Sequence, residues 1–174
     1  FVRREPTTFR LILLLCVTSL ALLPSAYFLP SFADKVLGGK AEMLGTLLAS
    51  AGLGALVGAL LMARKREVSG LPWVMGVSSL LLSADLALFS LSRSQVLSSI
   101  LLFCAGLCTM LAASSANIFL QTTAPERLRG RIISFYVTTF VGFPPLGGFF
   151  IGNLAERFGT GKVLLWCALA TAAA

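Results

Sequence analysis

The sequence predicts an all-α membrane protein built as a six-transmembrane-helix bundle, and three observations lead to this fold class. Hydrophobic residues make up 57% of the 174-residue chain and only 12% of its residues are charged, whereas about a quarter are charged in soluble domains. The mean hydropathy is +0.91. The charged residues also gather in short clusters that separate apolar runs long enough to cross a bilayer, which takes roughly 20 helical residues.

Five apolar runs have the length of a full span, and a sixth is shorter. The sixth begins near Lys162 and reaches Ala174 after about 13 residues, or roughly 20 Å of helix, so we expect the last helix to be truncated. Helix is the expected state of every run, because a segment in lipid must satisfy its own backbone hydrogen bonds and none of the runs alternates like a barrel strand. The predicted spans cover residues 11–29, 44–63, 71–91, 96–120, 132–155 and 162–174, which together make one bundle domain over residues 1–174.

The fourteen basic residues divide unevenly between the two sides of this bundle. Loops on the side of the N-terminus hold nine of them, and loops on the opposite side hold five. By the positive-inside rule, the N-terminus and the loop after the fourth span are cytoplasmic. The nine are Arg3, Arg4, Arg10, Arg64, Lys65, Arg66, Arg127, Arg129 and Arg131, and the five are Lys35, Lys40, Arg93, Arg157 and Lys162.

The segment after the fourth span, Pro-Glu-Arg-Leu-Arg-Gly-Arg, concentrates charge in one short loop. Arg127, Arg129 and Arg131 fall within five positions. Topology signals and contacts with lipid headgroups explain much of this cluster, and a binding site for an anionic ligand is the alternative. Glu126 stands beside the arginines, which makes a cytoplasmic ion-pair cluster conceivable, although exposed pairs of this kind are usually weak.

Glycines recur with the same spacing in the second and fifth spans. Gly54 and Gly58 stand four residues apart in the second span. Gly148 and Gly152 repeat this spacing in the fifth, which the topology runs in the opposite direction. A three-plus-three inverted repeat predicts such a match, and inverted repeats underlie many secondary transporters. Small residues at this spacing let helix backbones approach closely, so we interpret the four glycines as helix-packing residues rather than substrate contacts.

Asp85 is an acidic residue that lies well inside a predicted span. An ionised carboxylate at that depth costs roughly 2.5–3.5 kcal/mol on insertion scales, so a buried site or a polar partner is expected. Proton coupling is one role for such a group. The alternative is a structural position in the outer leaflet, facing a wet cavity or a polar neighbour, because the polar turn at Ser92 is only seven residues away.

Four further residues are candidates for a cavity or a gate. Asn117 and Gln121 are four residues apart and therefore share a face of the fourth helix near its cytoplasmic end. They either line a substrate path or, in the interpretation we prefer, bond the free backbone groups of the following loop. Pro144 and Pro145 remove two backbone donors from the fifth span and are expected to kink it in mid-membrane, where transporters place discontinuous helices.

The composition disfavours several other function classes. Histidine is absent and the four cysteines lie inside apolar runs, where cysteine behaves as a small hydrophobe, so we expect no metal site and no cofactor. The net charge of +7 forms no basic face on any element, which argues against a nucleic-acid partner. No GxSxG or Walker motif occurs, and acid–base catalysis within the membrane would rest on Asp85 alone, so an enzyme is not expected.

Two motifs make the sequence resemble a known family. Leu-Pro-Ser-Phe, residues 29–32, ends the first span and a glycine-rich span follows. Residues 121–134 then run Gln-Thr-Thr-Ala-Pro-Glu-Arg-Leu-Arg-Gly-Arg-Ile-Ile-Ser. In these motifs, and over nearly its whole length, the chain resembles the C-terminal half of a major facilitator superfamily transporter. It is most similar to the branch of bacterial exporters that contains the enterobactin exporter and the transmembrane secretion effectors.

The resemblance implies a twelve-helix fold with a central cavity and alternating access, of which this chain is the second six-helix bundle. The partners would be the lipid bilayer, the missing N-terminal half and a small-molecule substrate. Arg129, Gly130 and Arg131 would belong to a cytoplasmic loop that gates or latches the bundle. The expected function is proton-coupled export of small molecules, of the drug or siderophore type, across the bacterial inner membrane. A non-transporting scaffold or sensor with a degenerate transporter fold is the alternative.

Overall fold

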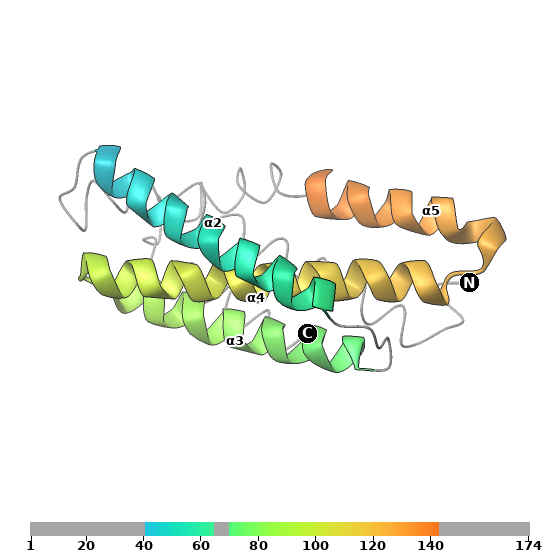
Figure 1. Cartoon of the computed structure of the whole chain (residues 1–174), viewed down its shortest axis with the longest axis horizontal. Coiled ribbons are helices and arrows are strands. Elements are labelled where there is room, and N and C mark those ends of the chain that lie inside the picture. Colours follow the sequence, from blue (N-terminus) through green and yellow to red (C-terminus); the bar gives the residue numbers. More distant parts are fainter. Residues whose placement is uncertain (1–40, 65–69, 143–174) are drawn as a thin grey trace, which may run out of the picture.

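The computed structural model describes residues 41–64 and 70–142, and the regular structure in this part of the chain is helical throughout. Its elements are, in order, α2 (Ala41–Arg64), α3 (Leu71–Leu91), α4 (Gln95–Thr123), α5 (Glu126–Val137) and a short π-helix, η1 (Thr138–Gly142) (Figure 1). Three stretches are long and apolar enough to cross a membrane, at Glu42–Arg64, Leu71–Phe89 and Gln95–Thr123. The all-α membrane fold class is therefore confirmed for the described residues.

The three long helices fall where the second, third and fourth spans were predicted. α3 has the predicted bounds, while α2 and α4 each begin earlier and end later than the apolar runs at 44–63 and 96–120. The predicted spans at 11–29 and 162–174 lie outside the described residues, as do residues 143–155 of the fifth. The six-helix bundle and its inverted repeat therefore stay predictions.

Local sequence explains where the helices start and stop. α2 carries Glu42 in its first turn and Arg64 in its last, and both charges are favourable for the helix dipole. α3 has a proline in its first turn, where the missing N–H would have no intrahelical partner in any case. It ends as the chain becomes extended at Ser92, whose backbone N–H donates a hydrogen bond of 3.1 Å to the carbonyl oxygen of Phe89. A three-residue connection then leads into α4.

α4 is the central helix of the described bundle, and the other helices pack along it (Figure 1). Leu47, near the start of α2, packs with Leu101 near the start of α4, so these two helices run parallel. Met75, near the start of α3, packs with Ala112 in the second half of α4, so α3 runs antiparallel. α5 returns antiparallel to α4 beside its last turns.

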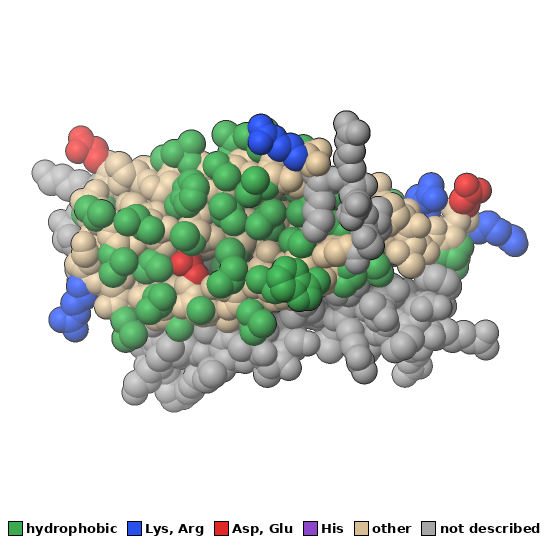
Figure 2. Space-filling view, turned by 60° about the horizontal axis from the view of Figure 1, so that its bottom comes forward, with side chains coloured by type: hydrophobic (Ala, Val, Ile, Leu, Met, Phe, Trp, Pro, Cys, Tyr) green, Lys and Arg blue, Asp and Glu red, His purple; other side chains and the backbone are tan. Residues whose placement is uncertain are grey.

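Large apolar side chains face outward along these helices. The leucines of α2 are an example, because about half of their surface is exposed at positions 48, 53, 56, 60 and 61. Figure 2 shows that hydrophobic side chains cover most of the described part of one face. In water such a surface would drive association, but lipid tails cover it in a bilayer. The arrangement is therefore that of an integral membrane protein.

The segment predicted as a cytoplasmic loop is helical, which corrects the expectation from the sequence. α5 begins at Glu126 rather than near Ile132. Pro125 starts the helix, because its φ of −57° is close to the helical value and its carbonyl oxygen accepts hydrogen bonds of 2.9 and 3.0 Å from the next turn. Hydrophobicity alone does not locate a helix whose first turn is charged. Glutamate and arginine are nevertheless good helix formers. The residues moved from loop to helix are Glu126, Arg127, Arg129, Gly130 and Arg131.

Candidate functional site

α2 and α4 cross with their backbones in direct contact, and glycines make this contact possible. A Cβ atom added to Gly54 would overlap the carbonyl oxygen of Phe103. A Cβ atom on Gly58, one turn later, would lie 2.9 Å from the carbonyl oxygen of Leu107. Backbone atoms cannot rotate out of the way, so a larger residue at either position requires the two helices to move apart.

Gly106 supplies the same close approach from the α4 side, and this contact was not predicted from the sequence. A Cβ atom on Gly106 would overlap the carbonyl oxygen of Ala51 in α2. Its neighbours one turn away, Leu102 and Met110, are large, so no small-residue pattern surrounds it. Gly148, Gly152, Pro144 and Pro145, the other packing and kink residues predicted, lie outside the described residues.

Asp85 is buried at the seam between α3 and α4, with 7% of its surface exposed. Its neighbours in α3, Leu82 and Leu86, pack with Ala105 and Cys108 of α4. The carboxylate lies close enough to the Cys108 thiol for an electrostatic interaction. Its Oδ2 atom is buried and has no hydrogen-bond partner within the part of the chain that the structure describes. Such a carboxylate is costly to keep ionised within a membrane, which makes Asp85 the described residue best suited to exchange a proton.

Asp85 belongs to a line of buried polar groups along α3. Ser78, Asp85 and Ser92 recur at every seventh position, and each is less than a tenth exposed. Seven residues are about two helical turns, so Ser78 and Asp85 share one side of the helix, and Ser92 follows directly after its end, roughly 21 Å from Ser78 along the axis. At the end of the line, the hydroxyls of Ser92 and Ser98 hydrogen-bond to each other at 2.9 Å. The seven-residue spacing is visible in the sequence and would have predicted this polar line.

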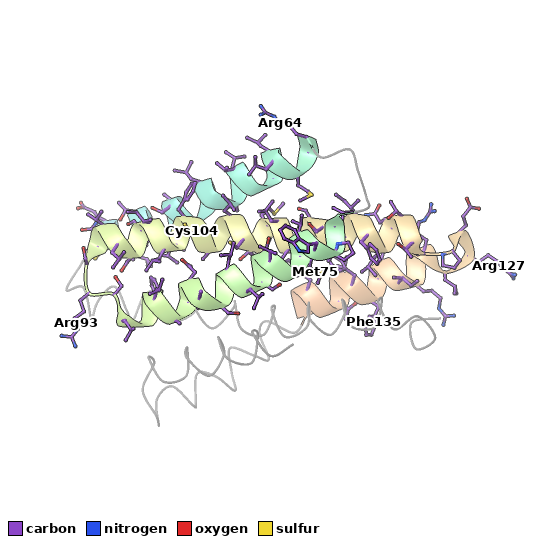
Figure 3. The ribbon with its side chains drawn as sticks, turned by 90° about the horizontal axis from the view of Figure 1, so that it is seen from below. Arg64, Met75, Arg93, Cys104, Arg127 and Phe135 are labelled. Atoms are coloured by element: carbon purple, nitrogen blue, oxygen red, sulfur yellow. The ribbon has the colours of Figure 1, made fainter. Side chains whose placement is uncertain are left out.

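The arginines at the start of α5 lie on two different sides of the helix. Arg127 and Arg131 line an open groove of about 580 Å³, and Arg129 does not. Arg127 lies at the opposite end of the described bundle from Arg93 (Figure 3). No ion pair joins Glu126 to these arginines within the described residues, so the ion-pair cluster considered from the sequence is not formed there. The residues that line the groove are Arg127, Gly130, Arg131, Ser134, Phe135 and Thr138.

Asn117 and Gln121 bond to each other rather than to the loop that follows them. The Gln121 side-chain amide donates a hydrogen bond of 2.6 Å to the Asn117 side-chain oxygen, and Gln121 is exposed. The bend after α4 is closed by the backbone instead, where the N–H of Ala124 donates to the carbonyl oxygen of Leu120 at 3.1 Å. The loop-tying role preferred from the sequence therefore finds no hydrogen bond among the described residues.

Comparison with protein families places the chain among transporters. The family model described as transmembrane secretion effector matches residues 7–174, which includes the four described helices. The chain belongs to this family. Its resemblance to major facilitator superfamily transporters is thereby confirmed, and with three membrane-crossing helices the chain is an integral membrane protein of the transporter class. No curated protein and no solved structure matches it.

The described helices of this transmembrane secretion effector offer little for a metal ion. Cys108 is buried and Cys104 is exposed, and both are free thiols. Within residues 41–64 and 70–142, no group of three or more histidine, cysteine, aspartate or glutamate side chains comes together. The polar groups described in this part are Asp85, the serines beside it, the Asn117–Gln121 pair and the arginines of α5.

Proposed function

We propose that this chain is the C-terminal six-helix bundle of a proton-coupled exporter of small molecules that works by alternating access. Membership in the transmembrane secretion effectors and three membrane-crossing helices support the transporter class. The observation that carries proton coupling is the buried Oδ2 of Asp85, which lacks a partner among the described residues. The substrate cavity is shared with a second six-helix half, and the protein lies in the bacterial inner membrane with its N-terminus in the cytoplasm.

A single buried carboxyl group is sufficient to link proton movement to a change of conformation. Enclosing ionised Asp85 in an apolar seam costs roughly 2.5–3.5 kcal/mol on insertion scales, so the bundle closes readily around the neutral acid only. Asp85 takes up a proton while it faces the periplasm and releases it after the bundle has reoriented toward the cytoplasm. The substrate moves in the opposite direction during the same cycle.

The glycine crossing supports a division of the bundle into parts that move together. Gly54, Gly58 and Gly106 bring the backbones of α2 and α4 into contact, so these two helices behave as one rigid body. α3 packs on α4 through side chains instead, at the seam that contains Asp85. Relative movement at this seam changes the surroundings of the carboxyl group, which is what coupling requires.

The remaining candidate residues have places in this proposal. The Asn117–Gln121 pair lies near the cytoplasmic end of α4 and contributes to the substrate path or its gate. Pro144 and Pro145, which lie outside the described residues, keep their proposed role as the kink of the fifth span. The arginine-rich first turns of α5 lie on the cytoplasmic side and fix the orientation of the bundle. No catalytic step is assigned to any of them.

The test compares two modes of transport by the full-length gene product in proteoliposomes. Ethidium is the probe, and it is followed first in uptake driven by a pH gradient and then in exchange between equal internal and external pools. Asp85→Asn is expected to abolish gradient-driven transport and to retain exchange, because exchange needs no net proton movement. Glu42→Gln is the matched control, since it makes the same exchange of an acid for its amide at an exposed position at the start of α2.

Three results would contradict the proposal. Gradient-driven transport that survives Asp85→Asn would remove Asp85 from the coupling step. Failure of the wild-type protein to move ethidium or any other amphipathic dye under a pH gradient would favour the non-transporting scaffold or sensor. Loss of both modes in Asp85→Asn, with normal folding, would assign Asp85 to substrate binding rather than to coupling.

A further inference from the structure

The proposed transport cycle assigns no role to the groove on α5. Its lining residues recur at three- and four-residue steps, from Arg127 through Arg131 and Ser134 to Thr138, and therefore form one side of the helix. Gly130 lies between the arginines, and a Cβ atom added there would meet no atom within 4 Å. Gly130 therefore leaves open space within the groove that Arg127 and Arg131 also line.

The charge of this groove is positive and uncompensated. Arg127 and Arg131 stand one helical turn apart, are exposed, and form no ion pair among the described residues. Glu126, the acidic residue next to them in the chain, is not part of the lining. Two guanidinium groups on one side of a helix match the oxygens of a phosphate group, because the planar guanidinium can donate two parallel hydrogen bonds.

The packing of α5 on α4 sets the depth of the groove in the membrane. The Tyr136 hydroxyl donates a hydrogen bond of 3.0 Å to the carbonyl oxygen of Ala113. α4 has 29 residues and is therefore about 43 Å long, longer than the hydrocarbon core of roughly 30 Å, and its C-terminal residues 117–123 include four polar side chains. Arg131 lies about 7.5 Å beyond Tyr136 toward this polar end, and Arg127 about 13.5 Å beyond it. The two arginines are therefore at the level of the lipid headgroups.

An exposed tryptophan indicates the same depth independently. Trp73 is 73% exposed and stands two residues before Met75, which packs with Ala112 and Ala116 of α4. Tryptophan is enriched at the boundary between hydrocarbon and headgroups. Trp73 therefore marks this boundary close to the level of Ala116, between the Tyr136 contact and the arginines.

Along its length, the groove changes from charged at the level of the headgroups to apolar toward the membrane interior. A phospholipid changes in the same direction, from its phosphate to its acyl chains. Phe135 is 57% exposed and lies on the side of α5 that faces away from α4 (Figure 3). It follows the arginines by one turn toward the membrane interior, and the hydroxyl-bearing Ser134 lies between them. A phospholipid whose phosphate is bound by the arginines thus has its acyl chains beside Phe135. A soluble anion would gain nothing from this apolar end.

We propose that the α5 groove is a binding site for an anionic phospholipid, whose phosphate lies between Arg127 and Arg131 and whose acyl chains run along Phe135. The site is distinct from the coupling carboxyl group, and its existence does not depend on the transport activity. Arg129, on another side of the helix, contributes to the general surface charge only.

The experiment measures lipid binding to the purified full-length protein in detergent by native mass spectrometry, at 150 mM salt. The probes are phosphatidylglycerol, phosphatidylcholine as a zwitterionic lipid with the same phosphate, and glycerol 3-phosphate as a soluble competitor. Arg127→Gln combined with Arg131→Gln is expected to weaken phosphatidylglycerol binding about 25-fold, because each arginine near the headgroups contributes about fivefold to the affinity. Arg129→Gln is the matched control and is expected to change the affinity less than twofold. Arg129 lies on another side of the helix, and salt screens its charge from a phosphate in the groove.

A second variant tests the groove without changing any charge. Gly130→Leu fills the space between the arginines with a good helix former, so folding is retained while the phosphate is displaced. It is expected to weaken phosphatidylglycerol binding at least tenfold. Equal losses in Arg129→Gln and in the double variant, or unchanged binding in Gly130→Leu, would overturn the proposal in favour of general surface charge. Competition by glycerol 3-phosphate at the affinity of the lipid would overturn it in favour of a soluble anion.

Discussion

Gly54→Ala tests the backbone contact between α2 and α4 with the smallest possible change. The added methyl group would overlap the carbonyl oxygen of Phe103, which cannot rotate away. Overpacking costs typically 1–3 kcal/mol, and a clash with backbone lies near the upper end of this range. Alanine regains about 1 kcal/mol over glycine in a helix interior. We therefore expect the free energy of unfolding to fall by about 2 kcal/mol.

Gly52→Ala is the matched control, because a Cβ atom at Gly52 meets nothing within 4 Å. The same exchange of glycine for alanine at this position should raise the free energy of unfolding by up to about 1 kcal/mol. The two variants should thus differ by about 3 kcal/mol, although they lie two residues apart in one helix. This difference depends only on the position of the glycine relative to α4.

Equilibrium unfolding by SDS in mixed micelles measures the difference. The labelling of Cys108 by a thiol-reactive fluorophore reports the transition, because Cys108 is only 5% exposed when folded. The other three cysteines are replaced by serine in the background used for all variants. If Gly54→Ala proves as stable as Gly52→Ala, the helices do not approach at Gly54 and the rigid α2–α4 pair is wrong.

Two further hydrogen bonds give predictions that the same assay can check. Tyr136→Phe removes the hydroxyl that donates to the carbonyl oxygen of Ala113 and should cost about 0.6–1.7 kcal/mol, from the average to the largest value for hydrogen bonds between membrane helices. No loss would mean that α5 is not held to α4 at this point. Ser92→Ala and Ser98→Ala each break the buried hydroxyl pair at the α3–α4 connection, and their double-mutant cycle should give a coupling energy of about 0.6 kcal/mol. A coupling energy near zero would show that the two serines do not act together.

The sequence predicted the helices far better than it predicted the contacts between them. α3 has the predicted bounds because apolar length alone determines where a membrane helix can lie. The start of α5 was missed, because apolar length does not reveal a charged first turn, although Pro125 and the glutamate and arginines after it favour a helix there. Gly54 and Gly58 were identifiable from their spacing, whereas Gly106 was not, since large residues, Leu102 and Met110, stand one turn on either side of it.

By itself, the sequence determined that this chain resides in a membrane, which parts of it can cross, and which family it resembles. These properties follow from solvation of the chain by lipid and from local motifs, and both can be recognised without neighbours in space. Only the tertiary structure decided that Asp85 lacks a hydrogen-bond partner among the described residues and that Gly106 meets the backbone of α2 at Ala51. Burial, pairing and shape depend on the packing of helices that are distant in the chain, and no single run of residues specifies them.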